Sequence, residues 1–167
     1  GNDVEELVYE GYASGGVAIL VEAITDNRNR TVAEVRHAFS KHGGNLGTDG
    51  SVAYLFTRLG VINYAPGQDE EQVMELALEA GADDIESDEE GGITVTTAWE
   101  TLGQVVETLT AGGLPPDHSE VTMMASNSSE CDLEQAQKVL KLIDVLEDLD
   151  DIQEVYSNGQ FPDEAYD

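Results

Sequence analysis

The amino-acid sequence predicts an α+β fold made of two small domains, one of them inserted into the other. Short runs of β-branched and apolar residues, typical of strands, alternate with four segments whose apolar residues recur at helical spacing. The middle of the chain has the order strand, helix, strand, strand, helix, strand, which is typical of a ferredoxin-like unit. The 167 residues are enough to bury a core without disulfides or metal ions.

The first elements are predicted to be a β-hairpin and a helix. Residues 4–12 and 16–25 are rich in β-branched and apolar residues, and a turn at residues 13–15 separates them. The helix is expected to open at Thr31, because Glu34 follows at the spacing of a capping box, and to end at the glycines 43 and 44. Its apolar face comprises Val32, Val35 and Phe39, and its solvent face comprises Glu34, His37 and Lys41.

Three later helices are predicted from the same start signal, an Asp or Thr followed three residues later by Gln or Glu. The pairs are Asp69 with Gln72, Thr97 with Glu100, and Asp132 with Gln135. Apolar residues at helical spacing follow: Val73, Leu76 and Ala80; Trp99, Leu102, Val106 and Leu109; and Ala136, Leu140, Ile143 and Leu146. Strands are expected at residues 51–56, 61–65, 84–87, 93–96, 120–125 and 152–156.

The order of these elements predicts where the domains begin and end. Residues 58–126 form the inserted ferredoxin-like domain in this interpretation, and residues 1–57 and 127–167 form a discontinuous α+β domain around it. The two crossings, near residues 58–60 and 126–129, are polar or contain glycine, as linkers usually do.

The charge of the chain is strongly negative and unevenly distributed. Seven Lys and Arg stand against 35 Asp and Glu, which gives a net charge of −28. Nucleic-acid-binding domains usually carry an excess of positive charge, so the chain as a whole should repel nucleic acid. However, residues 27–64 hold five of the seven bases and two acids, a local charge of +3, and they also contain two of the three histidines, His37 and His42.

Two loops that could hold ligands are better explained as turns. Residues 43–50 are rich in glycine, but they connect a helix to a strand and lack the Lys of a phosphate-binding loop, so a helix end and turn is favoured over a nucleotide site. The acidic run 83–90 lacks the Gly and Glu that an EF-hand requires at fixed positions, and residues 147–151 are treated in the same way. No cofactor and no metal site is predicted.

No arrangement of residues predicts catalysis. The nearest candidate is His37 with Ser40 and Asp49, but a single His on the solvent face of a helix is more often a surface residue than a base. Cys131 lies between two acids, which raise a thiol pKa. As the only cysteine it excludes an internal disulfide and fits a reducing compartment. We therefore expect a protein that is not an enzyme.

The basic group is the most informative feature for function. The candidate contacts to phosphates of nucleic acid are Arg28, Arg30, Arg36, His37, Lys41 and Asn45, with the adjacent glycines allowing close approach of the backbone. The alternative is a patch at a domain interface whose bases pair with the protein's own carboxylates. Arginine geometry suits either partner.

Several runs of sequence resemble the YebC/PmpR family. They are residues 9–12 with the glycines 15 and 16, residues 25–52, and residues 142–156, and the resemblance covers nearly the whole chain. One departure is Ala13-Ser14, where the family usually has Gly-Pro in the turn.

The resemblance implies a fold, a location and a function. An intact family member would have three domains, of which a basic helical N-terminal domain is missing here and the other two are α+β, one inserted in the other. The resemblance also implies a cytoplasmic bacterial protein, with some mitochondrial relatives, acting as a DNA-binding transcriptional regulator or as a ribosome-associated translation factor. The partner would be DNA, or RNA within the ribosome, bound mainly through the N-terminal domain.

Two other classes of function stay open. One is an acidic protein-interaction module that recruits basic protein partners. The other is a small-molecule sensor, because ferredoxin-like domains often bind ligands. No window approaches the length of apolar sequence that a membrane span requires, and no secretory signal is present, so no membrane partner is expected.

Overall fold

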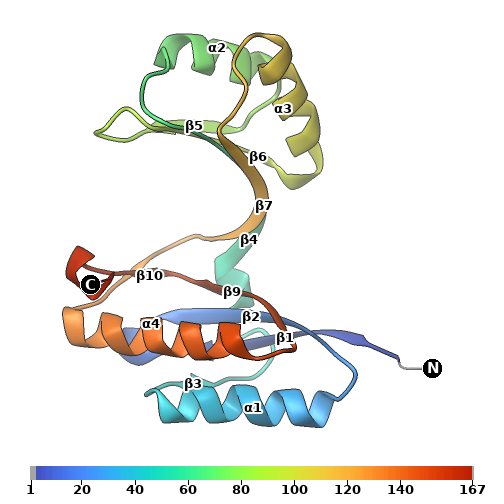
Figure 1. Ribbon diagram of the computed structural model, residues 1–167, viewed down its shortest axis with the longest axis vertical. Helices are drawn as coiled ribbons and strands as arrows, with labels where there is room; N and C mark the ends of the chain where they lie inside the picture. Colours follow the sequence, from blue (N-terminus) through green and yellow to red (C-terminus); the bar gives the residue numbers. More distant parts are fainter. Residues whose placement is uncertain (1–2, 167) are drawn as a thin grey trace. The chain divides into compact units, whose positions relative to one another are not determined.

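The computed structural model describes residues 3–166 and confirms the α+β fold class (Figure 1). The chain divides into two compact units: unit 1 comprises residues 1–57 and 125–167, and unit 2 comprises residues 58–124. The chain thus leaves unit 1, forms unit 2 and returns. That each unit folds independently, as the term domain implies, stays a prediction.

Unit 1 is a four-stranded sheet with two helices. Its strands are β1 (Glu5–Tyr12), β2 (Ala18–Thr25), β3 (Asn45–Leu46) and β9 (Ile152–Ser157), in the order β3-β1-β2-β9. The helices are α1 (Arg28–Lys41) and α4 (Leu133–Asp148). A separate parallel pair joins β8 (Ser129–Glu130) to β10 (Gly159–Gln160). The hairpin prediction is confirmed, since β1 and β2 pair antiparallel from Glu5↔Thr25 to Tyr12↔Ala18.

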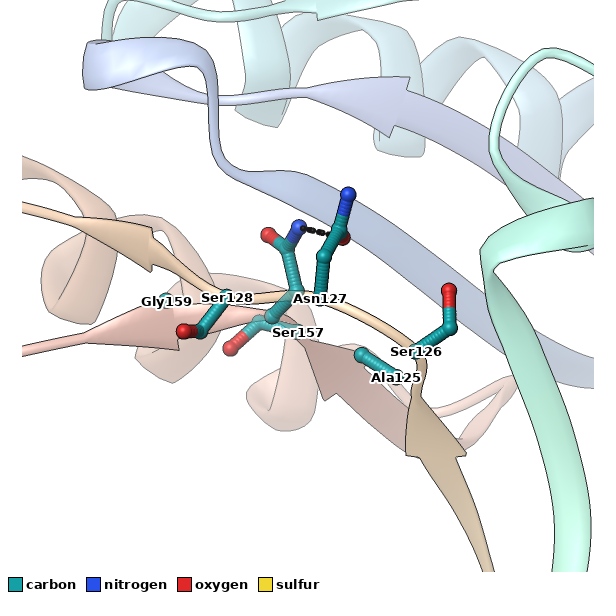
Figure 2. A pocket seen from close by; sticks show the side chains of 7 residues that line it. Ala125, Ser126, Asn127, Ser128, Ser157 and Gly159 are labelled. Atoms are coloured by element: carbon teal, nitrogen blue, oxygen red, sulfur yellow. Dashed lines mark hydrogen bonds between the residues drawn. The ribbon is translucent and has the colours of Figure 1, made fainter.

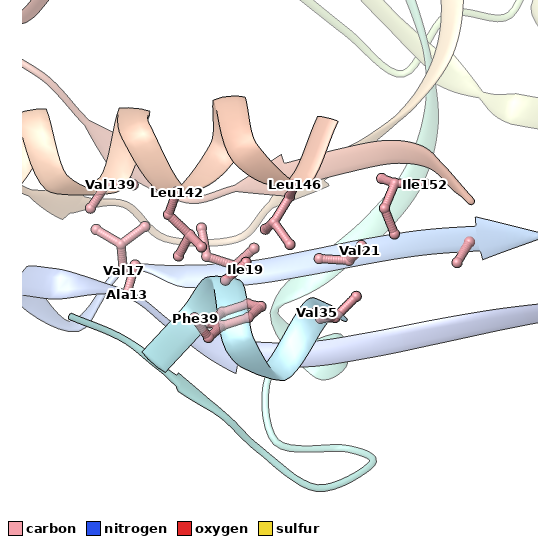
Figure 3. Packing of buried hydrophobic residues seen from close by; sticks show 12 residues of the cluster. Ala13, Val17, Ile19, Val21, Val35, Phe39, Val139, Leu142, Leu146 and Ile152 are labelled. Carbon is pink, nitrogen blue, oxygen red and sulfur yellow. The ribbon is translucent and has the colours of Figure 1, made fainter. Parts of the chain in front are cut away.

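The core of unit 1 lies between one face of the sheet and both helices (Figure 3). Alternate residues of β2 point to this face, as the strand period requires. Helix α4 differs from the predicted pattern, because it buries Val139 and Leu142 while Leu140 and Ile143 are half-buried. The main side chains of this core are fully buried: Val17, Ile19, Val21, Val35, Phe39, Val139, Leu142 and Leu146.

Unit 2 has the predicted ferredoxin-like arrangement. Its elements are β4 (Phe56–Tyr64), α2 (Glu70–Glu79), β5 (Asp84–Ser87), β6 (Ile93–Ala98), α3 (Leu102–Ala111) and β7 (His118–Ala125), with strand order β5-β6-β4-β7. Its core lies between the sheet and both helices and includes Ile62, Tyr64, Val73, Val95, Val105 and Leu109. No helix within residues 3–166 combines the length and apolar composition needed to cross a membrane.

Two of the four predicted helix starts are wrong. Helix α1 begins one turn earlier than Thr31, because the Asn27 side chain accepts a hydrogen bond from the Arg30 N–H and caps it. Thr97 is buried in β6, and a 3₁₀ turn at Trp99–Thr101 precedes α3. The starts after Asp69 and Asp132 are confirmed by side-chain caps.

The predicted strand at residues 51–56 is also wrong. A 3₁₀ turn occupies Ala53–Leu55, and β4 begins only at Phe56. The reason is a long-range contact: the Glu10 carboxylate on β1 accepts hydrogen bonds from the backbone N–H groups of Gly50, Val52 and Ala53, at 2.7, 2.9 and 2.6 Å. Amides held by one carboxylate cannot also form a strand ladder.

Candidate nucleic-acid interface

The N-terminal end of α1 carries two arginines that pair with the protein's own carboxylates. The Arg28 guanidinium donates two hydrogen bonds to Glu5 Oε2, through Nη2 at 2.7 Å and Nε at 3.1 Å. The Arg30 guanidinium bridges Asp151 Oδ2 at 2.9 Å and Asp26 Oδ1 at 3.3 Å. Their side chains are still 63% and 45% exposed. Both arginines therefore pair with carboxylates of unit 1, and both stay accessible to solvent.

Asp151 ties three segments of unit 1 together at this end of the helix. Besides Arg30, it accepts hydrogen bonds from the Thr31 hydroxyl at 2.7 Å and the Thr25 hydroxyl at 3.2 Å. The hydrogen bond from Arg30 and then that from Thr31 hold the pKa of Asp151 below its usual value. Asp151 is therefore ionised over the physiological range and neutralises much of the Arg30 charge.

The C-terminal half of α1 carries three basic side chains that make no ion pair within residues 3–166. They are Arg36, His37 and Lys41, and all three are exposed. Helical spacing puts His37 and Lys41 on one stripe with Arg30 and Glu34, while Arg36 lies on the other side of the exposed face. Lys41 in the last turn also suits the negative end of the helix dipole.

Lys138 of α4 lies near the end of α1, and Lys141 follows it one turn later on α4; the sequence prediction missed both lysines. Helices α1 and α4 lie along the same face of the sheet (Figure 1), and α4 begins beside the end of α1. A Cβ atom added to Gly43 would lie 3.9 Å from Lys138 Cδ. Lys138 also makes an exposed ion pair with Glu134 at 3.8 Å, and Lys141 is exposed.

The two helices therefore carry six of the seven Lys and Arg of the chain: Arg28, Arg30, Arg36, Lys41, Lys138 and Lys141. We call the part without strong internal pairing, Arg36, His37, Lys41, Lys138 and Lys141, the α1–α4 surface. The sequence shows that both lysines lie on the polar face of an amphipathic helix. The proximity of Lys138 to α1 comes from tertiary packing, which no local pattern shows.

The loop after α1 serves the fold. Asn45 is exposed and pairs with Tyr12 in the β3–β1 ladder. Gly43 has a φ of +80°, which favours glycine, and a Cβ atom on Gly44 would lie 2.5 Å from the Tyr12 carbonyl oxygen. The close approach that Gly44 allows is to strand β1.

The amides of the same loop already hold an anion. Burial raises the pKa of Glu10, but the N–H donors of Gly50, Val52 and Ala53 together outweigh it and keep its pKa below the usual value. Glu10 is 6% exposed. The protein's own carboxylate thus occupies the place where a phosphate would lie, which supports the turn interpretation of this glycine-rich loop.

The described residues offer little for catalysis. His37, Ser40 and Asp49 share no hydrogen bond among residues 3–166. Burial and then Asp132 raise the pKa of the Cys131 thiol, so it is not activated. In the same part of the chain, no group of three or more His, Cys, Asp or Glu is arranged to hold a metal ion.

Comparison with known proteins identifies the family. A family model described as the second and third domain of TACO1/YebC proteins matches residues 4–159. The chain belongs to the TACO1/YebC family. The resemblance seen in the sequence is confirmed.

Relatives in this family align over nearly the whole chain. Proteins of Serratia proteamaculans and Erwinia tasmaniensis are 61% and 60% identical over 164 residues, and each is named a probable transcriptional regulatory protein. The alignments cover 98% of this chain and 66% of each relative, so the chain spans about two thirds of their length. A solved structure, a conserved hypothetical protein of Aquifex aeolicus, is 47% identical with a TM-score of 0.78, covering 98% of this chain and 68% of that one.

Two hollows within residues 3–166 of this YebC-family chain present no excess of positive charge for a phosphate. One of about 340 Å³ is lined by Ala125–Ser128 and Ser157–Gly159, all uncharged (Figure 2). There the buried Asn158 accepts a hydrogen bond from the Ala18 N–H and donates one to Asn127 Oδ1, so it fixes the returning chain to the sheet. Another of about 480 Å³, beside Arg30, is also lined by four carboxylates, those of Asp26, Glu34, Asp150 and Asp151.

Proposed function

We propose that this YebC-family chain is part of a non-enzymatic, cytoplasmic regulator of gene expression that binds nucleic acid, and that the α1–α4 surface contacts its phosphates. The observation that carries the proposal is the gathering of six of seven Lys and Arg on two adjacent helices of a chain with net charge −28. The relatives named probable transcriptional regulatory proteins support the same class of function.

The contact would be electrostatic and modest in strength. Binding of Lys or Arg to phosphates releases condensed counterions, and each neutralised phosphate of duplex DNA contributes about −0.9 to the slope of log K against log salt. The α1–α4 surface has four full charges, so we expect a slope of at most about −3.6 from this surface. Arg28, Arg30 and Asn45 flank it and would contribute less, because Glu5, Asp26 and Asp151 already pair with the two arginines.

The test compares two charge reversals of equal size, one on the α1–α4 surface and one outside it. We expect Arg36→Glu to weaken binding of the chain to a 30-bp DNA duplex or a ribosomal RNA hairpin at least fivefold and to make the salt slope shallower by about 1. Arg58→Glu, the matched control at an exposed position of unit 2, should change affinity less than twofold, because Arg58 lies outside the proposed surface. Fluorescence anisotropy between 50 and 200 mM salt measures both. Equal losses in the two variants would reduce the effect to net charge and contradict the proposed surface.

The transcriptional and translational alternatives share this phosphate chemistry. Crosslinking of the full-length protein in cells, followed by sequencing of the attached nucleic acid, separates them: recovered promoter DNA supports transcriptional regulation, and recovered ribosomal RNA supports a ribosome-associated translation factor.

A further inference from the structure

We propose that the open edge of β5 and the adjacent flank of α2, both in unit 2, form a docking surface for an extended segment of a partner protein in which apolar and basic side chains alternate. This surface is separate from the α1–α4 surface and does not depend on nucleic-acid binding. Strand addition of this kind takes its affinity from main-chain hydrogen bonds and its specificity from alternate side chains.

The first observation is a free strand edge. Strand β5 ends the order β5-β6-β4-β7, and among the described residues only β6 pairs with it. The Asp88 N–H donates to the Gly92 carbonyl, and hydrogen-bonded pairs alternate along an antiparallel ladder. The pairs Glu86↔Thr94 and Asp84↔Thr96 are therefore bonded, and Ile85 and Ser87 direct their N–H and C=O groups away from β6.

The second observation is an apolar stripe beside that edge. Met74 and Leu78, four residues apart on α2, are 39% and 56% exposed. Leu76 lies on the other flank, close to Gly112 at the end of α3. Glu70, which shares the stripe of Met74 and Leu78, accepts a hydrogen bond from the Ser87 hydroxyl of β5 at 3.0 Å. The stripe therefore faces β5.

The third observation is the charge around this edge. Residues 69–90 contain eleven Asp and Glu and no Lys, Arg or His. Asp84 and Glu86 are exposed on the sheet face opposite the helices, because their neighbour Ile85 pairs with the buried Val95 on the helix face. An added strand would thus meet Met74 and Leu78 with one set of alternate side chains and Asp84 and Glu86 with the other.

The charges select the occupant. A second copy of this chain pairing through β5 would bring Asp84 and Glu86 against the same acids, which is destabilising across strands. Charged side chains on an edge are also how proteins prevent strands from pairing with themselves. An extended segment with lysine or arginine at every second position complements the acids, and apolar residues between them cover Met74 and Leu78.

The probe is an acetylated, fluorescein-labelled peptide of eight residues in which valine and lysine alternate. We expect it to bind the 167-residue chain at least tenfold more tightly than two controls: a peptide of the same composition with its lysines in one block, and the alternating peptide with N-methyl groups on the amides of one edge. General attraction between a polycation and an acidic protein would give all three peptides a similar affinity. Equal affinities would therefore overturn the proposal.

Variants of the protein locate the site. We expect Glu86→Lys to weaken binding of the alternating peptide at least tenfold and Leu78→Ser to weaken it about fivefold. Glu107→Lys, an equal charge reversal at an exposed position of α3, should change it less than twofold. Circular dichroism checks that each variant is folded, and the N-methylated peptide tests the same edge on the unchanged protein. Two results would contradict the assignment. One is an equal effect of Glu86→Lys and Glu107→Lys on peptide binding. The other is self-association of the chain in the absence of peptide, if Glu86→Lys abolishes it.

Discussion

At the scale of single residues, Glu10 determines the conformation of the segment before β4 in unit 1. The sequence pattern does not single this residue out. Its carboxylate is buried on β1 and holds three backbone N–H groups of the segment before β4. Removing the charge leaves those donors poorly satisfied in a buried place, which costs more than the same change on the surface.

We expect Glu10→Gln to lower the free energy of unfolding by about 2 kcal/mol at pH 7. The pKa of Glu10 lies below the usual 4.5 in the folded protein, so its contribution is complete above 4.5 and is lost as the pH falls through the folded value. The difference between the variant and the parent should therefore shrink at pH 3. Urea unfolding at both pH values measures it.

The matched control for this prediction is Glu6→Gln. Glu6 is an exposed glutamate on the same face of β1, four residues before Glu10. It should leave the free energy of unfolding unchanged within about 0.5 kcal/mol. A Glu10→Gln effect that persists undiminished at pH 3 would contradict the role assigned to the ionised carboxylate.

Residue patterns could predict part of the candidate site. Arg28, Arg30, Arg36, His37 and Lys41 are close in sequence on one helix, so a count of charges along the chain finds them. The pairing of Arg30 with Asp151 and the approach of Lys138 to Gly43 join segments about a hundred residues apart. No local pattern encodes such contacts, because packing of α1 and α4 on one sheet creates them.

At the scale of elements, the helix starts separate what local sequence decides from what it does not. Asp132 and Gln135 form a complete capping box at α4, in which each side chain accepts a hydrogen bond from the backbone N–H of the other residue. Thr31 matches the same spacing, but its hydroxyl donates to Asp151 and Asn27 caps the helix instead. Tertiary hydrogen bonds thus override the local signal at α1.

The cap of α4 gives a prediction at this scale. We expect Asp132→Ala to lower the free energy of unfolding by about 1 kcal/mol, because the N–H of Gln135 loses its acceptor and the capping box is broken. Asp144→Ala, at an exposed position later in the same helix, should change it by less than about 0.5 kcal/mol. Thermal unfolding followed by circular dichroism compares them, and equal shifts would remove the special role of the cap.

At the scale of the whole molecule, the two units have separate cores, and this separation can be measured. Trp99 is the only tryptophan and lies in unit 2, so its fluorescence reports that unit. Leu142→Ala in the core of unit 1 should cost about 2–5 kcal/mol there. We expect it to shift the circular-dichroism transition in urea and to leave the Trp99 transition in place.

The complementary variant is Leu109→Ala in the core of unit 2, which should move the Trp99 transition instead. If Leu142→Ala moves both transitions together, the units unfold as one and the predicted domain organisation is wrong.

The pairing of β9 with β2 has a consequence for biosynthesis. Strand β2 lies in the middle of the sheet of unit 1, yet its neighbour β9 is encoded after the whole of unit 2. On a ribosome that adds about 5–20 residues per second, the N-terminal hairpin must wait several seconds with one side of β2 uncovered, while unit 2 can already have formed. The nascent chain is therefore most vulnerable to aggregation and chaperone capture in that interval, and slow codons between the two strands would lengthen it.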